Sequence, residues 1–282
     1  MAACITIMTT IMSTDACPHP LPLPRFAGEG DKALPCEAGE GGDPREGAGR
    51  VGASEAAGLL RLLAWLSPSF PIGGYTYSHG VEQAVEAGFV RDRASLSDWV
   101  AFILEHGAGR SDAVLFAAAH RAVEAGDEPA FVRALERADA LRGSREMALE
   151  SSAQGTAFLS TVAAAWPLPG LERWQSIIDA ERRPPAHAVA VALCAALAGI
   201  PLGAALAGFL HAVAANLVSA GVRLVPLGQT DGQRALAALE PVAARVAVWA
   251  QTASPDDLGS RAPMVDWTSM THETQYTRLF RS

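Results

Sequence analysis

Ser78 and His79 are the first residues whose types and spacing could do chemistry. They are adjacent within the stretch "SPSFPIGGYTYSHGVEQAVEAG", residues 67–88. Serine and histidine act as nucleophile and general base in many hydrolases. A nucleophile elbow has the pattern Gly-x-Ser-x-Gly, and the first glycine of that pattern is missing here. A small hydrolase that uses Ser78 and His79 is therefore an alternative interpretation, which assays of the pure protein on a panel of esters would test.

The glycine-rich turn in the same stretch lacks two features of a phosphate-binding loop. Such a loop follows a strand and carries a Lys that reaches the phosphates. The run "PIGGYTYSHG" has no Lys and no strand-like segment before it. We therefore expect the chain to bind no nucleotide and to have no cofactor of its own.

The histidines give no metal-binding pattern. No two of them have the i, i+3 or i, i+4 spacing that places two ligands on one helix face. The one close Cys/His pairing, Cys17 with His19, lies in a loop-like tract. The sequence predicts no metal site and no catalytic residue, although distant histidines can still meet in the fold. The seven histidines are His19, His79, His106, His120, His187, His211 and His272.

Glu82 and Glu86 are a carboxylate pair in the same stretch, at i, i+4 spacing. A like-charge pair at this spacing is ordinary on a solvated helix face. General acid or base catalysis would need one of them buried beside the other. We expect a solvated face and no enzymatic role.

The composition favours helices and a protein partner. Half of the 282 residues are hydrophobic but only 6% are aromatic, and Ala and Leu dominate, which is a helix-forming bias. The net charge of -8 and the lack of a long cluster of Lys and Arg argue against nucleic acid as a partner. Lys32 is the single lysine, so the basic side chains are nearly all Arg, which suits bidentate pairing at protein interfaces. The first residues lack the basic region and long apolar core of a secretory signal, so we expect a cytoplasmic protein.

Three regions are expected along the chain. Residues 1–56 form a Pro/Gly-rich extension without apolar periodicity, which we expect to be disordered. Residues 57–260 form an all-α domain, a single compact bundle of about ten helices. Residues 261–282 are a polar tail with an aromatic and basic finish, and are a poor candidate for core.

Apolar periodicity places several helices in the middle region. The run at residues 95–109 carries a core-facing stripe, and Gly126 and Gly143 fall where helices should stop. Cys194 is expected to be an ordinary buried thiol. The stripe consists of Leu96, Trp99, Val100, Ile103 and Leu104.

Residues 188–210 contain no charge, which raises the question of a membrane span. Gly199 and Pro201 divide the run into two halves near a dozen residues each, too short to cross a bilayer. We expect two tightly packed buried helices and no membrane segment. A membrane-embedded helical protein is an alternative that solubility without detergent would test.

Three segments together resemble the signature segments of the urease accessory protein UreF family, in the same order and at nearly the same spacing. They are "SPSFPIGGYTYSHGVEQAVEAGFV", "AGVRLVPLGQTDGQ" and the terminal "HETQYTRLFRS". The resemblance covers about residues 58–282 and is specific, because three unusual motifs agree. The leading residues fall outside it.

The resemblance implies an all-helical, dimeric nickel-insertion factor with no catalysis of its own. Members of the family bridge UreD, called UreH in some organisms, and the GTPase UreG, in a complex that docks on apo-urease. UreG binds GTP, whose hydrolysis is coupled to nickel release. The family is thought to gate that step and to offer nickel an internal water-filled passage. A direct nickel chaperone is an alternative within the same class.

The resemblance also implies residues that face UreG or the nickel path. Glu82 and Arg223 are the main candidates, and we expect two exposed tyrosines beside the glycine turn as anchors. Arg223 is flanked by apolar residues, so it must reach solvent or find a carboxylate. The full set is Tyr75, Tyr77, Ser78, Glu82, Arg223 and Gln229.

The terminal motif matches the segment that, in the family, becomes ordered on UreD. Its aromatic and apolar side chains are suitable anchors, and its arginines are forked donors. The implied UreD-binding residues are His272, Glu273, Gln275, Tyr276, Arg278, Leu279, Phe280 and Arg281.

Prolines and glycines are expected to shape the turns of the first two motifs. Prolines fix φ, Gly73 and Gly74 permit a tight turn, and Ser78 or Thr76 can cap the helix that carries Glu82. The expected turn residues are Pro71, Gly73, Gly74, Gly80, Pro226 and Gly228.

Overall fold

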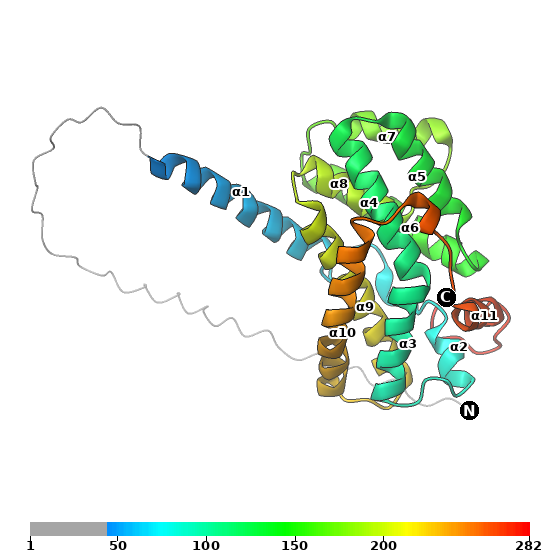
Figure 1. The fold of residues 1–282 in the computed structure, drawn as a ribbon. Coiled ribbons are helices and arrows are strands. Elements are labelled where there is room, and N and C mark those ends of the chain that lie inside the picture. The colour runs from blue at the N-terminus through cyan, green and yellow to red at the C-terminus, as the bar shows by residue number, and fades with distance from the viewer. Residues whose placement is uncertain (1–43) are drawn as a thin grey trace, which may run out of the picture. The chain divides into compact units, whose positions relative to one another are not determined.

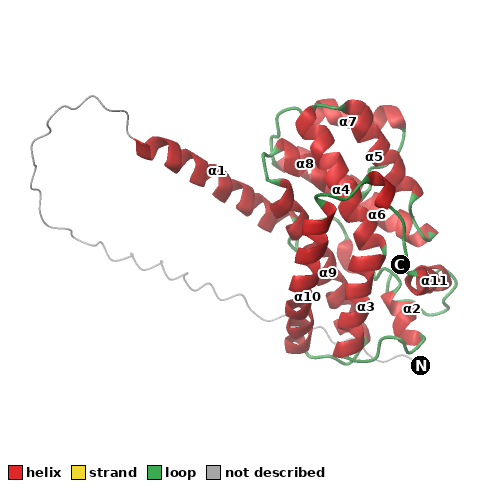
Figure 2. Ribbon diagram, viewed as in Figure 1, coloured by secondary structure: helices red, strands yellow, loops and turns green. Residues whose placement is uncertain are grey.

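The computed structural model describes the backbone of residues 44–282 and the side chains from residue 55 onward. This part of the chain forms eleven α-helices and two short 3-10 helices and contains no strand (Figure 2). The predicted all-α fold of about ten helices is therefore confirmed. The helices are α1 (Pro44–Trp65), α2 (Val81–Glu86), α3 (Arg93–His106), α4 (Ala108–Ala125), α5 (Glu128–Ala140), α6 (Arg145–Ala165), α7 (Leu171–Glu181), α8 (His187–Leu197), α9 (Leu202–Leu224), α10 (Gln229–Ala250) and α11 (Pro263–His272), with 3-10 turns η1 (Gly74–Thr76) and η2 (Pro255–Asp257).

The expected extension over residues 1–56 overlaps α1. This helix begins at Pro44, so residues 44–56 are helical where we expected disorder. The Cys17–His19 pairing and the rest of the extension lie outside the described residues. At its carboxyl end, α1 buries Leu62 and Trp65 in the core.

Helix α8 is buried along most of its length and lies beside α4 in the upper part of Figure 1. It packs against α4 and α6, and its residues 188–195 are buried throughout, including the free thiol of Cys194. Burial raises the pKa of that thiol, because the thiolate would lose its hydration. The approach to α6 depends on Gly155, where a Cβ would lie 2.0 Å from the carbonyl oxygen of Pro185.

Gly199 and Pro201 separate α8 from α9, as predicted. Gly199 has φ +67°, a left-handed conformation that favours glycine, and Pro201 is the N-cap residue of α9. The second half of the uncharged run does not end near residue 210, because α9 continues to Leu224. Among the described residues α9 is the one helix long and apolar enough to cross a membrane, but half of its apolar window is buried within the protein.

The predicted stripe on α3 is mostly confirmed. Leu96, Val100, Ile103 and Leu104 are buried, while Trp99 is half-buried and stacks on Phe89. Gly126 caps α4 in the left-handed conformation, as expected for a helix stop. Gly143 is not a helix stop, because α5 already ends at Ala140.

The tail, residues 261–282, is not the polar appendage that we expected. Its helix α11 buries Val265, Thr268, Ser269 and His272, and beyond the helix Phe280 and Ser282 are also buried. The expectation failed because the buried face of α11 is largely polar, so hydrophobic periodicity gave no sign of it. The tail packs on its own chain without a partner.

Candidate functional site

Three buried carboxylates hold the tail against α2 and α6. Glu82 lies in the first turn of α2, Glu146 lies in the first turn of α6, and Glu150 follows one helical turn later. Carboxylates so far from water are costly unless they are paired and hydrogen-bonded. Each of the three has such partners, and most of these partners belong to the tail.

Glu82 accepts hydrogen bonds from three tail groups. The backbone N–H of Leu279 donates to Oε1 at 2.7 Å, and that of Phe280 donates to Oε2 at 2.9 Å. The Nε2 atom of His272 lies 3.1 Å from Oε2. The expectation that Glu82 lies on a solvated helix face is therefore wrong, although Glu86, one turn later, is exposed.

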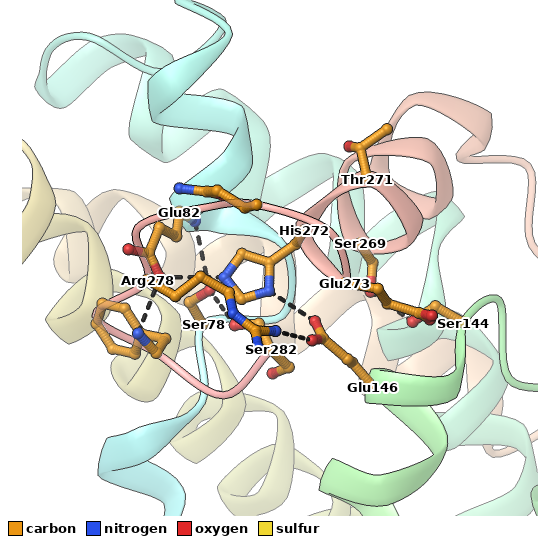
Figure 3. Close-up of polar contacts among 12 residues, drawn as sticks. Ser78, Glu82, Ser144, Glu146, Ser269, Thr271, His272, Glu273, Arg278 and Ser282 are labelled. Atoms are coloured by element: carbon orange, nitrogen blue, oxygen red, sulfur yellow. Dashed lines mark hydrogen bonds and ion pairs between the residues drawn. The ribbon is translucent and has the colours of Figure 1, made fainter.

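Glu146 binds both the end of α11 and the segment beyond it (Figure 3). Its Oε2 atom lies 2.6 Å from Nδ1 of His272, and its Oε1 atom accepts a hydrogen bond from Arg278 at 2.7 Å. The His272 ring, which has no exposed surface, thus lies between carboxylates from two different helices.

Glu150 binds the last residues of the tail. Together with Glu82 and Glu146 it forms a set of three carboxylates around the tail, which we call the cradle. The Oε2 atom of Glu150 accepts from Ser282 Oγ at 2.8 Å and lies 3.3 Å from Nδ1 of His79. Burial alone would raise the pKa of Glu150, but the His79 charge and the hydrogen bonds from His79 and Ser282 lower it below its usual value. Burial would likewise lower the pKa of His79, and the Glu150 carboxylate outweighs it and raises that pKa.

Gly80 lets the tail approach α2 closely. It is the N-cap residue of α2, with φ +78°, and a Cβ there would lie 2.9 Å from the backbone nitrogen of Ser269 on α11. The helix has no side-chain cap at Gly80, but the Oγ of Ser78 accepts a hydrogen bond from the Glu82 amide at 3.3 Å. The predicted capping role of Ser78 is confirmed in this form. Thr76 does not cap α2, because its Oγ1 donates to the carbonyl oxygen of Gly73.

Arg223 neither reaches a carboxylate nor extends freely into solvent, contrary to expectation. Its guanidinium lies over the Tyr75 ring, 3.8 Å from the centroid, and over the Phe280 ring at 4.3 Å. It also donates to the carbonyl oxygen of Tyr75 at 2.8 Å. Stacking on two rings offsets the cost of partly removing the guanidinium from water. Through these contacts Arg223, in the second motif, touches a residue of the first motif and a residue of the third.

The two tyrosines of the turn differ in exposure. Tyr75 is 67% exposed, whereas Tyr77 is 4% exposed, so the expectation of two exposed anchors is wrong for Tyr77. Tyr75 lies within η1, whereas Tyr77 follows this turn in an extended conformation, so the backbone directs the two rings differently. Ser78 is buried too, and its Oγ donates to the carbonyl oxygen of Ser282.

The remaining predicted site residues are distributed over the tail and the turn before α10. Tyr276 is fully exposed and Leu279 is 65% exposed. Glu273 accepts from the Arg145 amide. Of the two glycines expected to permit the tight turn, Gly73 has positive φ and Gly74 does not; Gly80 also has positive φ, and Gly228 is the N-cap residue of α10. Exposed positions also include Pro71, Pro226, Gln229 and Arg281, and Gln275 is half-buried.

A cavity of about 180 Å³ lies beside the cradle. Most of its wall is apolar, from helices α1, α3, α6 and α9, but one end is polar. There Asp112 pairs with Arg142 at 3.0 Å, and His79 and Glu150 are shared with the cradle. Burial lowers the pKa of His187, which also lines the cavity, to about 4, so this ring is neutral near pH 7.

The cavity has polar atoms that no described residue satisfies. The Nε2 atoms of His79 and His187 are buried and have no hydrogen-bond partner in the described part of the chain. No group of three or more His, Cys, Asp or Glu among the described residues is arranged to hold a metal ion. Buried polar atoms without a partner among the described residues, beside polar side chains, are suited to bind water.

Ser78 and His79 do not form a nucleophile–base pair. The Oγ of Ser78 donates to the carbonyl oxygen of Ser282, and the Nδ1 of His79 faces Glu150. The arrangement lacks the hydrogen bond from nucleophile to base that acyl transfer needs.

Sequence reasoning missed Glu146 and Glu150. A signal was present in "REMALESSAQG", where Glu146, Glu150 and Gln154 recur every four residues and therefore lie on one face of the helix. Their partners could not be inferred, because the tail residues are more than a hundred positions away.

Comparison with known proteins identifies related chains. A family model described as UreF matches residues 90–240. A protein named urease accessory protein UreF from Rhodopseudomonas palustris strain HaA2 is 52% identical over 239 residues, which is 85% of this chain and 100% of the relative. Proteins of the same name from R. palustris strain BisB5 and Bradyrhizobium diazoefficiens strain USDA 110 are 53% and 49% identical, over 82% and 83% of this chain and 94% and 96% of their own.

Proposed function

Because the chain belongs to the UreF family of urease accessory proteins, we propose that it is a non-catalytic scaffold for urease maturation. In this proposal it bridges UreD (UreH) and the GTPase UreG on apo-urease in the cytoplasm, and couples GTP hydrolysis on UreG to nickel insertion. Nickel is cargo, and the chain needs no cofactor of its own.

The observation that carries the proposal is the contrast between fixed backbone and free side chains in the tail. The Leu279 amide is bound to Glu82, yet the Leu279 side chain is 65% exposed, and Tyr276 is exposed completely. Large apolar side chains on a backbone already held in place lose little entropy when a partner covers them. We assign this surface to UreD.

A second surface is proposed for UreG. Tyr75 is exposed at the glycine turn and is held by Arg223 beneath it. Gln229 is exposed at the start of α10. Glu82 is not part of this surface, because its carboxylate is buried against the tail. Its proposed role is to position the tail.

The exposed leucines of α1 and the cavity fit two further parts of the proposal. Leu59, Leu60 and Leu63 are each more than half exposed on one helix, which favours a second copy of the chain as the partner. The cavity beside the cradle has the size and polar groups to hold water, as an internal passage for nickel requires.

Co-expression with UreD and UreG, followed by a pull-down, tests the proposal. Replacing Tyr276 and Leu279 together by alanine should weaken UreD capture by at least about tenfold, since anchor residues each contribute on the order of 1–2 kcal/mol. Val248→Ala on α10 is the matched control, because this side chain is equally exposed but lies away from the motifs. A wild-type chain that captures neither protein would overturn the proposal.

A further inference from the structure

The His272 ring needs two protons in the docked tail. Its Nδ1 and Nε2 atoms lie 2.6 Å and 3.1 Å from carboxylate oxygens of Glu146 and Glu82. An ionised carboxylate only accepts hydrogen bonds, and a neutral imidazole has one donor and one acceptor. Only the doubly protonated ring can donate to both sides.

The charges around His272 balance only with this proton in place. Glu82 on α2 and Glu146 on α6 contribute two negative charges, and Arg278 on the tail contributes one positive charge through its bond to Glu146. The ring supplies the second positive charge. Its deprotonation would leave a buried carboxylate facing a nitrogen lone pair, which is costly because the carboxylate is largely removed from solvent.

The segment beyond His272 depends on the carboxylate of Glu82, which also faces the His272 ring. Glu82 accepts from the Leu279 and Phe280 amides as well as from the ring, so a change in its position or charge affects all three bonds. The Arg281 amide donates to the Thr76 carbonyl oxygen at 2.8 Å, and these bonds together hold residues 279–282 on α2.

A second histidine acts in the same direction at the end of the tail. His79 faces Glu150 on α6, and Asp112 on α4 and Arg142 lie near it. Glu150 raises the pKa of His79, and the same carboxylate binds Ser282. Protonation of either histidine therefore favours the docked tail.

We propose that residues 273–282 form a proton-dependent latch, docked while His272 carries a proton on both ring nitrogens and released when it loses one. Helix α11 itself is held by other contacts, including the Ser269–Ser144 hydroxyl pair at 2.6 Å and the burial of Val265 and Thr268. The latch thus opens beyond the helix. It is a property of the single chain and involves no partner, so it stands or falls separately from the proposed scaffold role.

Hydrogen exchange on the full chain at several pH values between about 5 and 9 tests the latch. After correction for the intrinsic pH dependence of exchange, protection of the peptide containing Leu279, Phe280 and Arg281 should fall as the pH rises, by up to about tenfold per pH unit for one linked proton. Protection of α11 should remain constant over the same range. A tail protection that does not change with pH overturns the proposal.

Matched variants identify which side chain carries the proton that controls tail protection. His272→Gln should lose most of the pH dependence, whereas His211→Gln, at an exposed position on α9, should keep it. Glu146→Gln is a second test of the same proton. The glutamine amide can donate to or accept from a neutral His272 ring, so this variant should also show tail protection that changes little with pH. His79→Gln measures the share of the second histidine. A His272→Gln chain that keeps the full wild-type slope overturns the proposal.

Discussion

The guanidinium of Arg223 lies over the ring of Phe280, with 4.3 Å from its central carbon to the ring centroid, so a residue of α9 fixes the position of a tail residue. The same guanidinium covers Tyr75, and the glycine turn, α9 and the tail therefore share one side chain. Separate sequence motifs meet here as one structural unit.

Replacing Arg223 by lysine should weaken this unit even though the charge is kept. Lysine loses the planar group that stacks on both rings and the donor to the Tyr75 carbonyl. We expect a loss of about 1–2 kcal/mol in the free energy of unfolding. Urea unfolding of Arg223→Lys, Phe280→Leu and the double variant measures the coupling, and strictly additive losses would contradict the stacking.

Gly80 and Gly73 form a matched pair of left-handed glycines. Gly73→Ala should cost about 1–2 kcal/mol, since its φ is +72° but no atom lies within 4 Å of the added methyl group. Gly80→Ala has a similar φ and also pushes its methyl group against the Ser269 backbone, so it should cost more and loosen α11. Urea unfolding compares the two variants, and equal losses would show that the close approach is unimportant.

The stability of the chain should be greatest near pH 6.5. Burial lowers the pKa of His187 from 6.5 to about 4. Between these two pH values His187 is protonated in the unfolded chain but neutral in the folded chain, so the free energy of unfolding falls as the pH falls. The pKa of His79 is raised, so its contribution is complete below 6.5 and is lost as the pH rises through the folded value.

Glu150 adds to the acid limb of the same profile. Its pKa is lowered, so its contribution is present above the ordinary value of 4.5 and is lost as the pH falls through the folded value. Unfolding by urea at a series of pH values should show both limbs, with His187→Gln flattening the limb between about pH 4 and 6.5 and the exposed His211→Gln leaving it unchanged. An acid limb unaltered by His187→Gln would contradict the assignment.

Removal of the tail should destabilise the chain as well as abolish UreD binding. Deleting residues 271–282 would leave Glu82 and Glu146 without the tail groups that donate to their carboxylates. Buried charges that lose their partners cost about 3–5 kcal/mol. Thermal unfolding of the truncated chain should show this loss, while Tyr276→Ala, on an exposed side chain, should stay within about 0.5 kcal/mol of wild type.

Local patterns were sufficient for much of the fold. The stripe on α3 follows from helical periodicity, and the break between α8 and α9 follows from the φ preferences of Gly199 and Pro201. The boundary of α1 was misplaced because its first turns contain glycines and few apolar residues, which weaken any local signal.

The cradle could not be predicted because it depends on charge pairing between distant residues. Glu82 was recognised from its motif, but its burial was not, since a carboxylate at a helix start is usually solvated. Glu146 and His272 are 126 positions apart, and nothing local in either segment indicates that they meet. Tyr77 was misjudged because its burial depends on the backbone leaving η1 in an extended conformation, and a single turn gives no periodic signal.

The long sequence separation within the cradle has a consequence for synthesis of the chain. Glu82 is translated almost 200 residues before Leu279 and Phe280, which supply its backbone donors. Helices α2 and α6 therefore leave the ribosome before the tail partners of Glu82 and Glu146 have been made. Burial of these two carboxylates against the tail cannot be complete until the tail has been synthesised, and a nascent chain that stalls before His272 leaves them open to water.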